Sequence, residues 1–182
     1  MAGRLQTYVA LLRGVNLGSR NKISMADLRR LVEELDCEDV ATYVQSGNVV
    51  FRSRAAAAGL AGRIEKAISQ ETGLDVPVVV RSKAQLAKIV AANPFAKPRR
   101  DPKTLHVSFL SAKPTAASVK SLEPERFPRE ELHVAGTEVY LHYPDGYGRS
   151  KLTNAYLEKK LGVAATNRNW RTVTKLAELA GA

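Results

Sequence analysis

The chain has 182 residues, of which 45% are hydrophobic and 25% charged, and its formal net charge is +10. These values are ordinary for a soluble globular protein and argue against disorder. No apolar run approaches the roughly 18 residues that a membrane-spanning helix needs, and the N-terminus lacks the layout of a secretory signal. A single cysteine, Cys37, excludes an internal disulfide. We therefore expect a cytoplasmic protein with no membrane partner.

The positive charge is concentrated in the second half of the chain, in residues 83–122 and 149–182. A patchy positive field raises the local concentration of polyanions such as nucleic acid. The alternative is a basic surface that serves only solubility.

The first half is predicted to follow the order strand, helix, strand, strand, helix, strand. Thr7–Leu12 is apolar at nearly every position, which indicates a central strand covered on both faces. Ser24 and Asp27 form a capping box for the first helix, and Ser53 is placed to cap the second. The later strands of this half are expected at Val40–Val44, Asn48–Arg52 and Val76–Val80, the last with Pro77 at a sheet edge.

The second half repeats this order approximately. Ser82 and Gln85 form a capping box, and a hairpin turns at Ala135–Thr137. A Pro-rich basic loop, Phe95–Lys103, precedes the next strand. The remaining elements are expected as a strand at 104–110, a short helix at 114–122, the hairpin over 132–143, a helix from Ser150 to Leu161, and a last helix starting at Thr166 or Asn167. A final helix thus stands where a strand is expected, and we divide the chain into residues 1–82 and 83–182.

Three segments carry a family resemblance. YVALLRGVNLGSRNKISMADLRRLVEEL (8–35) and VATYVQSGNVVF (40–51) resemble the opening of the bacterial domain-of-unknown-function family sixteen-ninety-seven. DGYGRSKLTNAYLEKKLGVAATNRNWRTVTKL (145–176) is similar to its closing signature. The resemblance implies two α+β halves, each like the ferredoxin-like arrangement, and no established activity. We expect an α+β fold of two ferredoxin-like (βαββαβ-type) halves packed together, the second incomplete with an extra C-terminal helix.

Two loops combine glycine, amide and basic residues between a predicted strand and a predicted helix: Arg13–Lys22, and Asp145–Lys151, which leads on to Asn154. Free backbone N–H groups and a helix dipole suit such a junction to an anion, although neither loop fits the Walker or dinucleotide pattern. Arg149 and Lys151 flank the predicted helix start, where cations are unfavourable, so a bound anion is one interpretation. The other is an ordinary tight turn with both side chains in water.

We hypothesise that the protein binds an anionic ligand, a nucleotide or nucleic acid. The predicted phosphate contacts are Arg13, Asn16, Lys22, Arg149, Lys151 and Arg168. The other candidate ligand residues are Gln45, Ser46 and Asn48, which also read as a simple turn, and Asn154 and Asn169.

Two alternatives stay open: an enzyme acting on a small phosphorylated or carboxylated metabolite, and a protein-interaction or oligomerisation module. No catalytic residue is assigned. The three histidines, His106, His133 and His142, lack metal-ligand spacing, so we expect neither a metal ion nor a cofactor.

Overall fold

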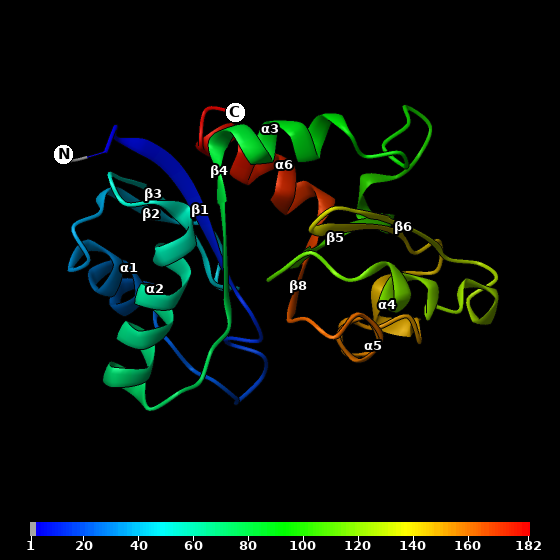
Figure 1. Ribbon diagram of the computed structural model, residues 1–182, viewed down its shortest axis with the longest axis horizontal. Helices are drawn as coiled ribbons and strands as arrows, with labels where there is room; N and C mark the ends of the chain where they lie inside the picture. Colours follow the sequence, from blue (N-terminus) through cyan, green and yellow to red (C-terminus); the bar gives the residue numbers. More distant parts are fainter. Residues whose placement is uncertain (1–2) are drawn as a thin grey trace. The chain divides into compact units, whose positions relative to one another are not determined.

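The structure is a computed structural model that describes residues 3–182. In this range the fold is mixed α+β, with two four-stranded antiparallel sheets and six α-helices (Figure 1). Backbone contacts divide the chain into two compact units. The first ends at Lys88 and also takes in Leu176–Ala182, and the second is Ile89–Lys175.

The first unit has the predicted order of strands and helices. Its strands lie in the order β2-β3-β1-β4, all antiparallel, so β1 is central and β4 is an edge strand, as predicted. Pro77 precedes β4 and therefore removes no ladder hydrogen bond. The elements are β1 Gln6–Leu12, α1 Met25–Glu33, β2 Glu38–Thr42, β3 Asn48–Ser53, α2 Ala57–Thr72 and β4 Val78–Ser82.

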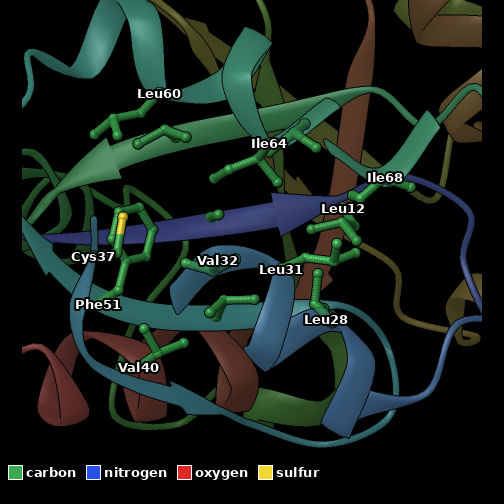
Figure 2. Close-up of a cluster of buried hydrophobic side chains, with 14 of the residues drawn as sticks. Leu12, Leu28, Leu31, Val32, Cys37, Val40, Phe51, Leu60, Ile64 and Ile68 are labelled. Atoms are coloured by element: carbon green, nitrogen blue, oxygen red, sulfur yellow. The ribbon is translucent and has the colours of Figure 1, made fainter. Parts of the chain in front are cut away.

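Helices α1 and α2 pack on one face of this sheet (Figure 2). Alternate residues of β1 point toward them, and the residues between, such as Val9 and Leu11, are also buried. This is why β1 reads as an unbroken apolar run. The helices contribute residues at helical spacing. Those residues are Leu28, Leu31 and Val32 of α1 and Leu60, Ile64 and Ile68 of α2.

Three helix caps were predicted for residues of the first unit, and two of them are confirmed. Ser24 accepts a hydrogen bond from Asp27 N at 3.0 Å, and Ser82 and Gln85 bond each other's backbone N–H reciprocally. The predicted cap at Ser53 is wrong. Helix α2 begins later, behind Ala56, and Ser53 instead accepts from Ala55 N at 3.1 Å because its strand extends through it.

The second unit contains a second sheet, in the order β6-β7-β5-β8, with β5 central. Helices α4 and α5 share a core with one face of this sheet. The hairpin turn at Ala135–Thr137 is confirmed. Helices α3 Lys83–Ala91 and α6 Trp170–Leu179 carry the chain between the units. The other elements are β5 Leu105–Leu110, α4 Ala116–Lys120, β6 Glu131–Ala135, β7 Glu138–His142, α5 Asn154–Leu161 and β8 Ala165–Asn169.

The expectation of an incomplete second half is wrong. Residues 165–169 form β8, which pairs antiparallel with β5, and the last helix starts at Trp170 rather than at Thr166 or Asn167. The segment ATNRN carries no alternating hydrophobic pattern, and its Thr and Asn residues resemble helix-capping signals. Pairing with a buried central strand outweighs that weak local preference.

Gly47 gives a direct test of the packing between β3 and β1. Its φ is +79°, and an added Cβ would lie 2.7 Å from Leu12 Cβ and from Val15 Cγ2. We expect Gly47→Ala to lower the free energy of unfolding by about 2–4 kcal/mol, from overpacking and left-handed strain together. Urea denaturation followed by circular dichroism measures this. The control is Gly148→Ala, where an added Cβ would meet no atom within 4 Å, so stability should change little.

Candidate functional site

The first predicted ligand loop, Arg13–Lys22, is held together by the side chain of Asn16. Its Nδ2 donates to Ile23 O at 2.9 Å and to Gln45 O at 2.8 Å, and its Oδ1 accepts from Ile23 N at 3.0 Å. Asn16 also adopts a φ of +54°, which asparagine tolerates better than most residues. The amide is therefore fully engaged in tying this loop to the β2–β3 turn.

The β2–β3 turn is similarly occupied by its own contacts. Asn48 is 0% exposed and donates to Tyr43 O at 3.0 Å and to Ser46 Oγ at 2.9 Å. Gln45 is exposed, and its backbone oxygen accepts from Asn16. The structure brings these four predicted ligand residues together, but the amides of Asn16 and Asn48 hold the backbone instead of facing outward.

The two predicted cations of the first loop differ in setting. Arg13 is half-buried, and its backbone N–H donates to Pro77 O at 2.9 Å. Lys22 is exposed. The helix that follows already has Asp27 in its first turn, and this carboxylate accepts from Ser24 Oγ at 2.7 Å. An acidic group thus stands at the helix N-terminus where the sequence suggested a bound anion.

Val44 is the strained residue of this region. Strand β2 ends at Thr42, so the predicted strand to Val44 is two residues too long, and Val44 adopts a φ of +49° with 51% of its surface exposed. A β-branched residue is rare in this left-handed conformation because its Cβ crowds the backbone.

We expect Val44→Asn to raise the free energy of unfolding by about 1 kcal/mol, because asparagine tolerates positive φ. Thermal denaturation of both proteins measures the difference. Val44→Ala also removes exposed apolar surface, but alanine has no polar side chain to hydrogen-bond locally at positive φ, so it should gain much less. If the free energy of unfolding rose equally in the two variants, the loss of exposed apolar surface would explain the gain, and backbone strain at Val44 would be contradicted.

The second predicted loop differs from the sequence expectation at its helix. Ser150 does not cap α5: the helix starts at Asn154, and Thr153 accepts from Tyr156 N at 3.1 Å as its N-cap. Arg149 instead ends a short 3-10 turn, Tyr147–Arg149. The two cations therefore do not flank a helix start, and the dipole argument for a bound anion at this point is wrong.

The segment between β7 and α5 is fixed at several points. Asp145 pairs with Arg129 at 2.8 Å, and Ser150 donates to Glu130 at 2.7 Å. Tyr143, at the start of the segment, donates its hydroxyl to Leu152 O at 2.9 Å. Both carboxylates in contact with the segment are thus occupied. Arg149 and Lys151 are exposed, and neither forms an ion pair within the described part of the chain.

Arg168 and Asn169 lie in strand β8, so their predicted place in a helical first turn is wrong. Arg168 is 8% exposed and donates to Asn167 O at 2.9 Å. Burial lowers the pKa of its guanidinium to about 10, so it is still charged at neutral pH. Asn169 donates to Lys103 O at 3.1 Å and accepts from Arg171 N at 2.9 Å, which supports the start of α6.

A row of polar side chains crosses the α5-facing side of the second sheet. His106 and Ser108 of β5 and Asn167 of β8 lie on one face because the register pairs Ser108 with Asn167. His106 Nδ1 lies 2.7 Å from Asn167 Oδ1, and Asn167 Nδ2 donates to Ser108 Oγ at 3.0 Å. Asn154, the first residue of α5, lies 3.5 Å from Ser108 Oγ.

Two tyrosines enclose the imidazole of His106. The Tyr147 ring stacks on it with centroids 5.1 Å apart, and the Tyr143 ring meets it edge-on at 5.2 Å. His106 is 8% exposed, and this burial lowers the pKa of its imidazole, against a smaller opposing effect of the hydrogen bond to Asn167. The histidine is therefore neutral at neutral pH.

These contacts define what we call the His106 edge: His106, Ser108, Asn154, Asn167 and Tyr147. Of its members, the sequence pointed to Asn154 alone as a ligand residue. The others were missed because a polar residue in a strand becomes informative only when its face is known. Had residues 165–169 been predicted as a strand, the alternation of side chains would have placed Asn167 on one face of the sheet.

The His106 edge also carries cations. Lys103 is exposed, lies three residues before His106, and is fixed near β8 by the bond from Asn169 to its backbone oxygen. Arg149 lies two residues after Tyr147. Fully extended, three residues span at most about 11 Å and two about 7 Å. Backbone connectivity thus keeps the Cα atoms of both residues within about 11 Å of the backbone of His106 or Tyr147.

Two further findings concern residues 3–182. None of the helices there is both long and apolar enough to cross a bilayer. No group of three or more His, Cys, Asp or Glu side chains in the same range is arranged to hold a metal ion.

Comparison with known families follows the resemblance seen in the sequence. Residues 5–140 match the family described as "Protein of unknown function (DUF1697)". The chain belongs to this family. The match to the DUF1697 family ends at Tyr140, before the segment 145–176 that forms part of the His106 edge.

Among solved structures, this DUF1697 protein is similar to one described as conserved bacterial protein SP0830 from Streptococcus pneumoniae. The two are 23% identical, with a TM-score of 0.71 over 97% of this chain and 99% of the other. At this identity the likeness shows the fold alone. No curated protein matches the chain.

The lowered pKa of His106 predicts acid sensitivity. Below the ordinary histidine value of 6.5, the unfolded chain binds a proton that the folded chain does not. The contribution to stability is therefore complete above pH 6.5 and is lost as the pH falls from there toward the lower folded pKa.

We expect His106→Gln to flatten this part of the stability curve, which changes by at most about 1.4 kcal/mol per pH unit for one group. Urea denaturation at several pH values between about 7.5 and about 5.5 measures it. His133→Gln, at an exposed histidine of β6, is the control and should keep the wild-type slope. If the free energy of unfolding of His106→Gln fell with pH as steeply as that of the wild type, His106 would not be the source of the acid sensitivity.

Proposed function

We propose that the protein binds an anionic ligand of the nucleotide class at the His106 edge of the second unit. One observation carries the proposal. Lys103, Arg149 and Lys151 are exposed, lack ion-pair partners among residues 3–182, and lie close in sequence to residues of an aromatic and amide-lined edge. Cations without ion-pair partners can make charge-assisted hydrogen bonds to a phosphate.

The aromatic residue beside these cations supports a ligand with a ring. Tyr147 is half-buried and stacks on His106. Base stacking on an aromatic side chain contributes about 1–3 kcal/mol. Charge and stacking together fit a base linked to phosphate better than phosphate alone.

A mononucleotide fits these features better than a long single strand. Single-stranded nucleic acid sites combine several stacking residues with a basic groove along roughly 4–16 nucleotides. Here the edge offers one half-buried tyrosine ring and three cations. Of the two ligands that the charge distribution suggested, a nucleotide and a nucleic acid, we therefore propose the nucleotide.

The predicted ligand residues of the first unit receive a different role in this proposal. Asn16 and Asn48 hold backbone groups, and Asn154 likewise donates to Ala165 O. Of the predicted ligand residues, Arg149 and Lys151 are the ones that contact the ligand in this proposal. We also propose that each unit is ferredoxin-like, because both sheets arise from the order strand, helix, strand, strand, helix, strand with equivalent strand orders.

A second candidate function is an enzyme acting on a small phosphorylated or carboxylated metabolite. The observation in its favour is the buried neutral histidine beside the cations, since such a group can accept a proton. The interaction-module alternative rests on a sheet edge left unpaired in the second half. That sheet has four strands, and its edge strands are β6 and β8.

The test compares two charge-matched double variants. Arg149→Gln/Lys151→Gln removes two cations of the proposed site, and Lys120→Gln/Lys159→Gln removes two exposed lysines of helices α4 and α5. We expect the first variant to weaken binding of adenosine monophosphate at least tenfold, about 1.4 kcal/mol, because charge-assisted hydrogen bonds are lost. The control should bind within about twofold of wild type, by calorimetry at fixed salt.

Three results would go against this function. Equal weakening in both variants would show a non-specific effect of net charge. Binding of oligouridylate without binding of any mononucleotide would replace the small ligand by nucleic acid. Wild-type binding in Arg149→Gln/Lys151→Gln would exclude these two cations from the site.

A further inference from the structure

A backbone carbonyl fixes which atoms donate and which accept in the row of hydrogen bonds that runs from Asn154 through Ser108 and Asn167 to His106. Asn154 Nδ2 donates to Ala165 O at 2.6 Å. A carbonyl oxygen accepts and cannot donate, so the amide of Asn154 must present its NH₂ group there. Its Oδ1 consequently faces Ser108, where it can only accept.

This orientation is passed along the row. Ser108 Oγ donates its proton to Asn154 Oδ1 over a long 3.5 Å contact, so toward Asn167 it can only accept. Asn167 therefore points Nδ2 at Ser108, at 3.0 Å, and Oδ1 at His106. The 2.7 Å contact between Asn167 Oδ1 and His106 Nδ1 then requires a proton on Nδ1.

A neutral imidazole has one N–H, and here Nδ1 carries it. Nε2 is left with a lone pair. Within residues 3–182, His106 makes its side-chain hydrogen bond through Nδ1 and makes none through Nε2. The groups that face the ring are the phenol rings of Tyr143 and Tyr147 and the amide of Asn167, and none of them is a carboxylate or a cation.

We infer that Nε2 of His106 is a fixed hydrogen-bond acceptor for the ligand, and that the ligand carries a hydroxyl or amino hydrogen next to its anionic group. For a nucleotide, a ribose hydroxyl supplies that hydrogen. Lys103, Arg149 and Lys151 take the negative group, and Nε2 distinguishes a ligand that carries this hydrogen from the same ligand without it. This inference rests on the proposed function for the anion, whereas the tautomer follows from the protein alone.

Buried polar atoms of native proteins are almost always paired, with protein groups or with water. Within residues 3–182, Nε2 of His106 is not among the buried side-chain atoms that lack a partner, although the residue as a whole is only 8% exposed. Nε2 is therefore open to water or to a ligand, while the relay of Asn154, Ser108 and Asn167 selects the tautomer.

The first test reads the tautomer directly. We expect ¹⁵N-resolved NMR of ligand-free wild type at neutral pH to show His106 protonated at Nδ1 only. Ser108→Ala removes the hydroxyl that orients Asn167, so that amide can rotate and both tautomers should appear. Ser111→Ala removes a hydroxyl that accepts from Ala164 N outside the row, and it should leave the wild-type spectrum. Protonation at Nε2 in wild type, or an unchanged spectrum in Ser108→Ala, overturns the relay.

The second test reads the ligand. We expect wild type to bind adenosine monophosphate roughly 3- to 10-fold more tightly than its 2′,3′-dideoxy analogue, the range of one neutral hydrogen bond. The Nε2 resonance should shift with the first ligand and not with the second. Ser108→Ala should reduce the preference. Equal binding of the two nucleotides with an unmoved Nε2 resonance overturns the donor requirement. Failure of both nucleotides to bind, with Nδ1 still protonated, overturns the proposed nucleotide function and leaves the tautomer standing.

Discussion

The antiparallel pairing of β8 with β5 is the constraint on which the candidate site depends. Its register places Asn167 opposite Ser108 and diagonal to His106, so all three polar side chains share one face. Successive residues of a strand point to opposite faces, and a slip by one residue would bring Arg168 to that face and remove Asn167 from it. The polar row therefore exists only in this register.

The two units use similar loops in different ways. Both loops join a strand to a helix and contain glycine and basic residues. In the first unit Asn16 binds backbone groups on both sides of the loop, and an acidic residue stands in the first turn of α1. In the second unit the carboxylates Asp145 and Glu130 are held by Arg129 and Ser150, so the neighbouring cations stay without them. Composition alone does not separate these cases, because the partner atoms lie far apart in sequence.

Burial determines the chemistry of the His106 edge. An exposed histidine exchanges its hydrogen bonds with water, and its tautomers interconvert freely. The ring of His106 is enclosed by Tyr143, Tyr147 and Asn167, which favours the neutral form and ties the proton to one nitrogen. The cations beside it remain in solvent, where they are charged and accessible. A neutral acceptor and positive charges thus stand near each other without a carboxylate that would neutralise them.

The sequence by itself determined the first sheet, the caps at Ser24 and Ser82, and the central place of Thr7–Leu12, because these depend on local periodicity and on residues three or four apart. It also placed the chain in its family. It could not determine β8 or the role of Asn16, since each depends on partners between seven and about sixty residues away. The start of α5 was predicted wrongly although its cap, Thr153, is local. Only the tertiary structure decided that a short polar segment forms a strand, and with it which amides are clamps and which histidine nitrogen is left to accept, because hydrogen-bond direction is set by atoms that the fold brings together.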